Sequence, residues 1–219
     1  MCKLADDTSN RVIAVVAAAR PEDTNFVEQL RRGAHPRRVG IRRVLHVVDD
    51  DVSRAPLFRR HVALLADHGL SFDICMRADQ LPLAQELVQG APATRFILDH
   101  GGNPPLGQPD GLNRWREEVS RLSQHANVVC KLSGLVNHLP AGANALEVLQ
   151  PIVNHLLTCF GWQRLLFGSD WPVCTLANLD VPAWLDMARR LTAHLPEAAS
   201  QAIFTTNALC VYQQEQKSV

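Results

Sequence analysis

The chain has 219 residues, with 22 Lys and Arg against 22 Asp and Glu, so its formal net charge is zero. Hydrophobic residues make up 47% and charged residues 20%, which is typical of a globular protein and not of a disordered one. Zero net charge removes the basic surface expected of a nucleic-acid binder. No stretch approaches the roughly 18 to 20 apolar residues that span a bilayer, and Asp6 and Asp7 interrupt the start of the chain before a secretory signal can form. We therefore expect one domain over residues 1–219, in the cytoplasm, with no nucleic-acid or membrane partner.

Short apolar runs of strand length alternate with stretches of helical periodicity along the chain, which is typical of βαβ units and a parallel sheet. The predicted strands are Val12–Ala18, Val39–Val47, Ser71–Arg77, Arg95–His100, Asn127–Ser133 and Arg164–Ser169. The predicted helices are Glu22–Arg32, Ala55–Gly69, Leu81–Gly90, Leu112–His125, Ala145–Phe160, Val181–His194 and Glu197–Gln214.

The predicted strands begin on average about 30 residues apart. This is the repeat of a (β/α)₈ barrel, and a doubly wound open sheet could share it. The chain has no G-x-G-x-x-G after the first strand and no P-loop, so neither usual nucleotide site is supported. Only six strands are found where a barrel has eight. A barrel would therefore lack its first roughly 60 residues, at two repeats of about 30.

Six cysteines occur without any C-x-x-C pair, which argues against a disulfide framework and a zinc finger. Cys75 and Cys130 lie in predicted strands, and we expect them to be small buried hydrophobic residues.

Polar side chains mark the ends of the predicted strands, where a barrel forms its active site. Because alternate strand residues point inward, Arg42 and His46 share the inner face of the second strand, and Asp73 and Arg77 that of the third. Asp99 and His100 end the fourth strand.

The last two strands continue this pattern. Lys131 and Ser133 share one face of the fifth, and Asp170 ends the sixth beside Trp171, which offers it an aromatic wall. A barrel that needed only packing would not require such residues at five successive strand ends.

Each of these residues also has a purely structural reading. Asp170 could cap a helix, His100 could be a hydrogen-bonded structural histidine, and Lys131 could belong to a core salt bridge. The basic cluster around Arg42 is more simply a solvated face than an anion site. The remaining histidines outside the strands are expected at the surface, namely His35, His61, His68, His125, His138, His155 and His194.

Three segments together carry a family resemblance: Phe96–Pro104 (FILDHGGNP), Asn127–Gly134 (NVVCKLSG) and Leu166–Val173 (LFGSDWPV). They resemble amidohydrolase family 2, the TIM-barrel metal-dependent hydrolases, and within it the sugar-acid lactonases that open L-fuconolactone and L-rhamnonolactone. The likeness runs from about Val12 to Tyr212. It implies an incomplete (β/α)₈ barrel of the TIM type, with strands three to eight present.

The resemblance also implies roles for single residues. Asp170 matches the general base of the eighth strand, which is a ligand where metal is bound, and His100 matches the histidine of the sixth strand at the same site. Arg77 matches a basic residue that suits a hydroxyl-rich or carboxylated substrate. Where relatives often carry a second Arg two positions on, this chain has Asp79.

The expected reaction is hydrolysis of a sugar-acid lactone. Asp170 takes a proton from water, and His100 orients the water or polarises the carbonyl. Arg77, His46, Arg42, Lys131 and Trp171 are the expected substrate contacts. One divalent metal of the zinc type is implied, with Asp170 and His100 as its ligands; metal-independent hydrolysis is the alternative, since some lactonases of the family are thought to work without metal.

The departure from the family lies at the front of the chain. Its relatives carry a metal-binding His-x-His in the first strand, and no H-x-H occurs in this sequence. Two unpaired sheet edges are then expected, at Val12–Ala18 and Arg164–Ser169, through which copies of the chain could associate. The alternatives to a lactonase are an inactive truncated remnant, a mis-started chain, or a decarboxylase of the family.

Overall fold

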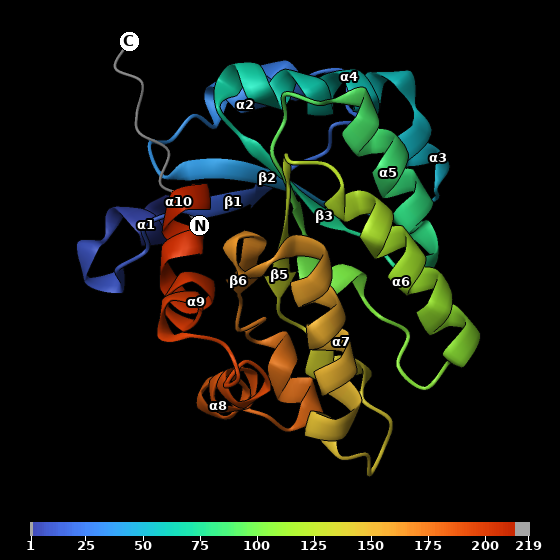
Figure 1. Ribbon diagram of the computed structural model, residues 1–219. Helices are drawn as coiled ribbons and strands as arrows, with labels where there is room; N and C mark the ends of the chain where they lie inside the picture. Colours follow the sequence, from blue (N-terminus) through green and yellow to red (C-terminus); the bar gives the residue numbers. More distant parts are fainter. Residues whose placement is uncertain (1, 213–219) are drawn as a thin grey trace.

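The computed structural model describes residues 2–212 and shows six parallel strands in one sheet, in the same order as in the sequence (Figure 1). The strands are β1 (Val15–Ala18), β2 (Arg38–Val44), β3 (Ser71–Cys75), β4 (Phe96–Leu98), β5 (Val128–Leu132) and β6 (Leu165–Phe167). The α-helices are α1 (Cys2–Asp6), α2 (Phe26–Arg32), α3 (Asp51–Arg54), α4 (Pro56–Leu64), α5 (Leu81–Gly90), α6 (Pro109–Ser123), α7 (Ala145–Phe160), α8 (Val181–Leu191), α9 (Glu197–Gln201) and α10 (Asn207–Tyr212).

The six predicted strands are all present, and the parallel βα order of the incomplete barrel is confirmed. Five of the strands end one to three residues before their predicted carboxyl ends, whereas β1 ends at Ala18 as predicted and begins three residues later than predicted. The last predicted helix is broken into α9, a π-helical turn over Ala202–Thr206, and α10. Gln213 and Gln214, its predicted end, lie outside the described residues.

The main core lies between the outer face of the sheet and the helices around it (Figure 1). Phe72 of β3 makes edge-on ring contacts with Phe58 of α4 and Phe96 of β4, at centroid distances of 6.0 and 6.2 Å. Ile41 and Leu45 are buried in this core, as the alternation predicts. The same alternation predicts that Val47 also faces the helices, but Val47 is 69% exposed because β2 ends at Val44.

The inner face of the sheet is covered in part by the carboxyl-terminal helix. Val211 of α10 and the adjoining Tyr212 pack against Ile97 and Leu166, which point inward from β4 and β6. The guanidinium of Arg95 donates a hydrogen bond to the Val211 carbonyl at 3.0 Å. The last helix therefore packs against the inner face of β4 and β6.

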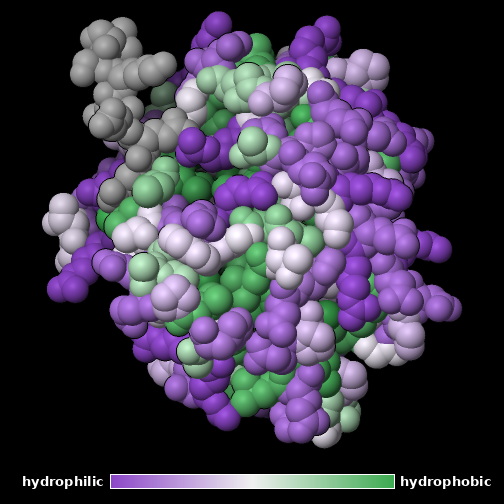
Figure 2. Space-filling view, in the orientation of Figure 1, coloured by the Kyte–Doolittle hydropathy of each residue, from purple (hydrophilic) through white to green (hydrophobic). Residues whose placement is uncertain are grey.

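The sheet ends at β1 on one side and β6 on the other, and among the described residues these two strands do not pair. The two open edges expected from the sequence are thus present. Hydrophilic residues cover most of the face seen in Figure 2, with hydrophobic residues between them. Within residues 2–212, no helix is long and apolar enough to cross a membrane.

Candidate active site

Four charged side chains meet inside the barrel and are called here the lumen quartet: Arg42 of β2, Asp73 of β3, Asp99 after β4 and Lys131 of β5. The Lys131 ammonium lies 2.6 Å from Asp73 Oδ2 and 2.8 Å from Asp99 Oδ1. The Arg42 guanidinium lies 3.1 Å from Asp73 Oδ2 and 3.0 Å from Asp99 Oδ2. Both carboxylates are fully buried. Each therefore faces two cations, and the quartet is neutral as a whole.

A left-handed turn follows β4 and carries His100 to the rim of the barrel. Its four residues, His100–Asn103, have positive φ angles between 53° and 75°. A run of this kind strains residues with a Cβ, and the two central glycines make it accessible. At Gly101 a Cβ would also lie only 3.0 Å from the Leu156 side chain. The DHGGN sequence thus turns His100 away from the strand direction and toward the neighbouring strand end.

A second strained position places Asp170 after β6. Asp170 has φ of 55°, and the Gly168 carbonyl just before it accepts a hydrogen bond of 3.0 Å from Trp184 Nε1 of α8. Strained backbone at residues other than glycine gathers at functional sites. His100, Asn103 and Asp170 are such residues at the carboxyl edge of the sheet, and they include one imidazole and one acid.

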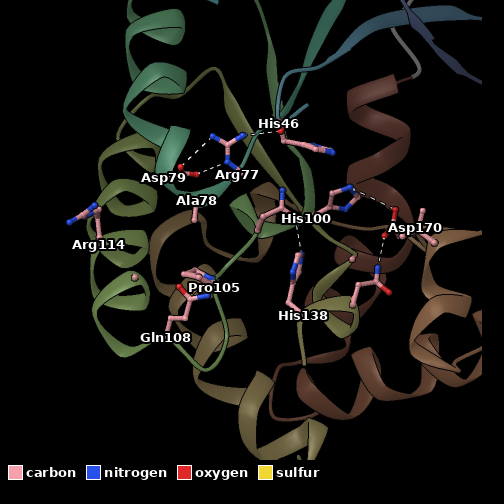
Figure 3. Close-up of a pocket in the computed structure, with 15 residues that line it drawn as sticks. His46, Arg77, Ala78, Asp79, His100, Pro105, Gln108, Arg114, His138 and Asp170 are labelled. Carbon is pink, nitrogen blue, oxygen red and sulfur yellow. Dashed lines mark hydrogen bonds and ion pairs between the residues drawn. The ribbon is translucent and has the colours of Figure 1, made fainter. Parts of the chain in front are cut away.

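His100 and Asp170 face each other across this edge (Figure 3). His100 Nε2 lies 3.7 Å from Asp170 Oδ1, and His100 Nδ1 lies 2.9 Å from the Ser133 hydroxyl. Asn137 Nδ2 donates a hydrogen bond of 3.0 Å to Asp170 Oδ2. The distance between imidazole and carboxylate is too long for a hydrogen bond, and a water molecule could contact both.

Burial moves both groups toward their neutral forms. It lowers the pKa of His100 to about 4, against the opposing charge of Asp170. It also raises the pKa of Asp170 above the usual range, although His100 opposes the shift. At neutral pH the imidazole is therefore uncharged, and the carboxylate has a greater affinity for a proton than an exposed one.

A cavity of about 740 Å³ opens above this pair. We call its strand-end residues the mouth: His46, Arg77, His100, Asn137 and Asp170. Arg77 donates to the His46 carbonyl at 2.8 Å and pairs with Asp79 at 3.0 Å. Asp79, which stands where relatives often carry a second Arg, thus neutralises Arg77.

Arg114 of α6 also lines the cavity, and within the described part of the chain no ion-pair partner is found for it. The cavity therefore holds one cation, Arg114, that is available to an anion or to hydroxyl groups.

The structure brings together four of the predicted site residues and separates the other three. His46, Arg77, His100 and Asp170 line the cavity. Arg42 and Lys131, predicted as substrate contacts, are instead committed to the lumen quartet and do not line the cavity, because Asp73 and Asp99 hold both cations inside the barrel.

Trp171, also predicted as a substrate contact, is 69% exposed and does not line the cavity. The strained backbone at Asp170 turns the chain outward just before it.

Sequence reasoning missed Asn137 and His138, which line the cavity from a 3₁₀ turn after β5, Leu135–His138. His138 is exposed, as expected from the sequence, but its place at the cavity was not predicted. The sequence signal for this turn was Gly134, because glycine readily adopts positive φ angles. Its φ of 66° ends the extended segment and folds Leu135–His138 back over the mouth. His61, also expected at the surface, is buried and its Nδ1 lies 2.8 Å from the Pro21 carbonyl.

The donor atoms near the mouth suit a metal ion of the zinc class. Cys75, Asp99 and His100 each offer one ligand atom, and these atoms lie within 4.8 Å of one another. Asp99 Oδ2 is buried and receives no hydrogen bond. Sulfur, imidazole nitrogen and carboxylate oxygen together are a zinc-type set. The residues present therefore fit such an ion, although the first-strand histidine pair is missing.

Comparison with known proteins gives one consistent result. The family model described as Amidohydrolase (Amidohydro_2) matches residues 1–214. The chain is 35% identical over 190 residues to an L-fucono-1,5-lactonase of Burkholderia multivorans, covering 81% of this chain and 63% of that protein. It is 35% identical over 153 residues to the L-fucono-1,5-lactonase of Burkholderia ambifaria, covering 68% and 52%. The chain thus spans about half to three fifths of the length of these curated relatives.

A solved structure agrees with the sequence comparison. An amidohydrolase of Burkholderia multivorans, crystallised with bound zinc, superposes with a TM-score of 0.89 at 30% identity. The match covers 97% of this chain and 76% of that one. Nearly all of the present fold thus corresponds to most of a larger barrel.

Proposed function

The chain belongs to the amidohydrolase family, and from this premise we propose that it hydrolyses the cyclic ester of a sugar acid, with Asp170 as the general base. The observation that carries the proposal is the facing pair of Asp170 and His100 on strained backbone beneath a cavity of about 740 Å³. The similarity to two L-fucono-1,5-lactonases supports a lactone as the substrate class.

Asp170 receives the proton of the attacking water. A water held between Asp170 Oδ1 and His100 Nε2, which lie 3.7 Å apart, stands within hydrogen-bond reach of both. As the water attacks the lactone carbonyl, its proton passes to the carboxylate. The raised pKa of Asp170 favours this transfer near neutral pH.

His100 acts as a neutral hydrogen-bond donor. Its pKa of about 4 keeps the imidazole uncharged. If the Ser133 hydroxyl donates to Nδ1, at 2.9 Å, the proton of the ring stands on Nε2 and faces Asp170. That N–H orients the water or stabilises the carbonyl oxygen as negative charge develops on it.

The other cavity groups bind the substrate. His46 and Arg77 offer their side chains to the hydroxyl groups of the sugar, and Arg114 offers a free guanidinium to the carboxylate that ring opening produces. If Cys75, Asp99 and His100 held a zinc-class ion, the ion would polarise the carbonyl as a Lewis acid, and the His100 nitrogen that bound it would no longer make the hydrogen bond described above.

The proposal is tested by turnover of a panel of sugar-acid lactones, followed through the acid that ring opening releases. We expect Asp170→Asn to lower kcat by about 10²- to 10⁴-fold, the usual contribution of a general base. Asp186→Asn, the same change at an exposed site on α8, is the matched control and keeps wild-type turnover. Retained turnover in Asp170→Asn, or no turnover of any lactone by the wild-type chain, would overturn the proposal.

A further inference from the structure

Two side chains of the cavity wall, Asn103 and His138, have no part in the proposed reaction, and a chain of hydrogen bonds joins them. The Asn103 side-chain amide donates to the Met76 carbonyl at 2.6 Å, and Asn103 Oδ1 lies 3.2 Å from His138 Nε2. Met76 follows β3, Asn103 follows the turn after β4, and His138 ends the 3₁₀ turn after β5. The hydrogen bonds therefore cross three successive strand ends at the rim of the barrel.

These hydrogen bonds fix which nitrogen of His138 carries the proton. A backbone carbonyl only accepts hydrogen bonds, so Asn103 presents its NH₂ group to Met76 and its oxygen to His138. An amide oxygen also only accepts, so the proton of the His138 ring stands on Nε2. Desolvation at the cavity wall lowers the pKa of His138, and the ring is therefore neutral at neutral pH. A neutral imidazole has one N–H group, which leaves Nδ1 with a free lone pair.

The lone pair of His138 Nδ1 is available to a molecule in the cavity. Among residues 2–212, the only hydrogen-bond partner found for the His138 ring is Asn103, at Nε2. Two other acceptors of the cavity are engaged, since Asp79 pairs with Arg77 and Asp170 is the proposed base. A charge on His138 would lower the pKa of His100, because the two imidazoles lie near each other in the cavity wall (Figure 3). A group bound at Nδ1 would therefore lie near the proposed reaction centre.

An acceptor of this kind distinguishes between the oxygen atoms of a sugar lactone. A hydroxyl group can donate a hydrogen bond to Nδ1, whereas the ring oxygen, the carbonyl oxygen and a carboxylate can only accept one. A site that binds a hydroxyl group binds an analogue without it more weakly, because the polar atom of the site then loses its partner. His138 is therefore suited to a hydroxyl group and not to an anion.

We propose that His138 is a specificity-determining residue, which accepts a hydrogen bond at Nδ1 from a hydroxyl group of the substrate, and that Asn103 is its positioning residue. The proposal rests on the lactone hydrolysis proposed above and deepens it. It defines the substrate as a lactone with a free hydroxyl group near the reacting carbonyl.

The first test is ¹⁵N NMR of the full chain labelled at its histidines, which needs no turnover. We expect His138 Nε2 to resonate as a protonated nitrogen and Nδ1 as an unprotonated one, and the loss of both signals in His138→Ala assigns them. Asn103→Gly removes the amide and keeps the positive φ of 53° accessible. In this variant the two tautomers should exchange, so both signals should move toward intermediate values. Asn178→Gly is the matched control, since Asn178 has a comparable φ of 56° and does not line the cavity.

The second test compares turnover of a sugar-acid lactone with turnover of analogues that each lack one hydroxyl group. For at least one analogue, the wild-type chain should show a KM about 2- to 12-fold higher, which is the value of one hydrogen bond. His138→Ala should raise the KM of the parent lactone by the same factor and leave kcat nearly unchanged. It should abolish the difference for that analogue and keep the differences for the others. His68→Ala, at an exposed histidine of the 3₁₀ turn Leu65–His68, is the control and should keep all wild-type values.

The outcomes separate this proposal from the proposed hydrolysis. If the chain turns over lactones but the proton of His138 stands on Nδ1, the role of His138 is overturned and the hydrolysis stands. The same conclusion follows if His138→Ala loses turnover equally for the parent lactone and for every analogue. A wild-type chain that turns over no lactone would overturn the hydrolysis and this proposal with it.

Discussion

The lumen quartet and the mouth lie in the same barrel, and burial has opposite outcomes for their basic groups. In the lumen quartet, burial opposes the charged forms of Arg42 and Lys131, but Asp99 and Asp73 outweigh it and raise the pKa of both cations. Burial also raises the pKa of Asp73, against the attraction of Lys131 and Arg42. In the mouth, burial prevails and moves His100 and Asp170 toward their neutral forms. The quartet thus keeps two cations charged between the strands, whereas the mouth holds an uncharged imidazole that can exchange protons with its neighbours.

The largest effect on stability is expected where the quartet is broken. Lys131→Met leaves two buried carboxylates facing one guanidinium, and removing one partner from buried ion pairs costs about 3–5 kcal/mol. Urea denaturation measures the loss.

The control for this change is Arg32→Met, which breaks an exposed ion pair with Glu28. It should cost less than about 1 kcal/mol, because solvent already screens that pair. Equal losses in the two variants would show that the quartet contributes no more than a surface pair.

The largest effect on turnover among these predictions is expected at Gly134, which lies against the His100 imidazole. Gly134 has a φ of 66°, and a Cβ at this position would lie 2.7 Å from His100 Nδ1. Gly134→Ala should therefore displace the imidazole and lower lactone turnover by about 100-fold, since a shift of about 1 Å at a reacting group can cost that much.

Gly142→Ala separates crowding from backbone strain. Gly142 has a comparable φ of 74°, but a Cβ there meets nothing within 4 Å. This variant should lose about 1 kcal/mol of stability and keep its turnover. If Gly134→Ala turns over lactone at the wild-type rate, His100 does not need its present position.

The smallest effect is expected at Asn137, whose amide donates to Asp170 Oδ2 at 3.0 Å and lowers the pKa of that carboxyl. Without the amide, the pKa of Asp170 rises further, so the base is protonated at a higher pH. In Asn137→Ala the acid limb of kcat/KM should move to higher pH, and turnover at neutral pH should fall by up to about tenfold, the value of one hydrogen bond.

Asn154→Ala, on the exposed side of α7, is the control for this change and should leave the pH profile in place. A profile that moves to lower pH in Asn137→Ala would contradict the hydrogen bond's assigned effect.

Much of the fold was predictable from local pattern. The β-branched runs located all six strands, and alternation placed Ile41 and Leu45 toward the helices and Arg42 toward the lumen. Strand ends were harder, because they depend on backbone turns. β4, for example, has only three residues, because a turn of positive φ angles follows it over His100–Asn103. The apolar periodicity of the sequence does not predict such a turn.

The site was predictable only in part, for the same physical reason. The strand-end rule found His100 and Asp170, whose positions follow from strand order alone. It could not separate Arg42 and Lys131 from the mouth, since their partners are set by the register of β2, β3 and β5. Asn137 was missed because it reaches the cavity from a 3₁₀ turn.

A double-mutant cycle of His100→Asn and Asp170→Asn tests most directly whether these two residues act as one unit on lactone hydrolysis. If they share one water, each single variant lowers kcat/KM strongly, and the double variant is no more than about threefold slower than the worse single one. If the two losses instead multiply in the double variant, the residues act independently and the account is contradicted.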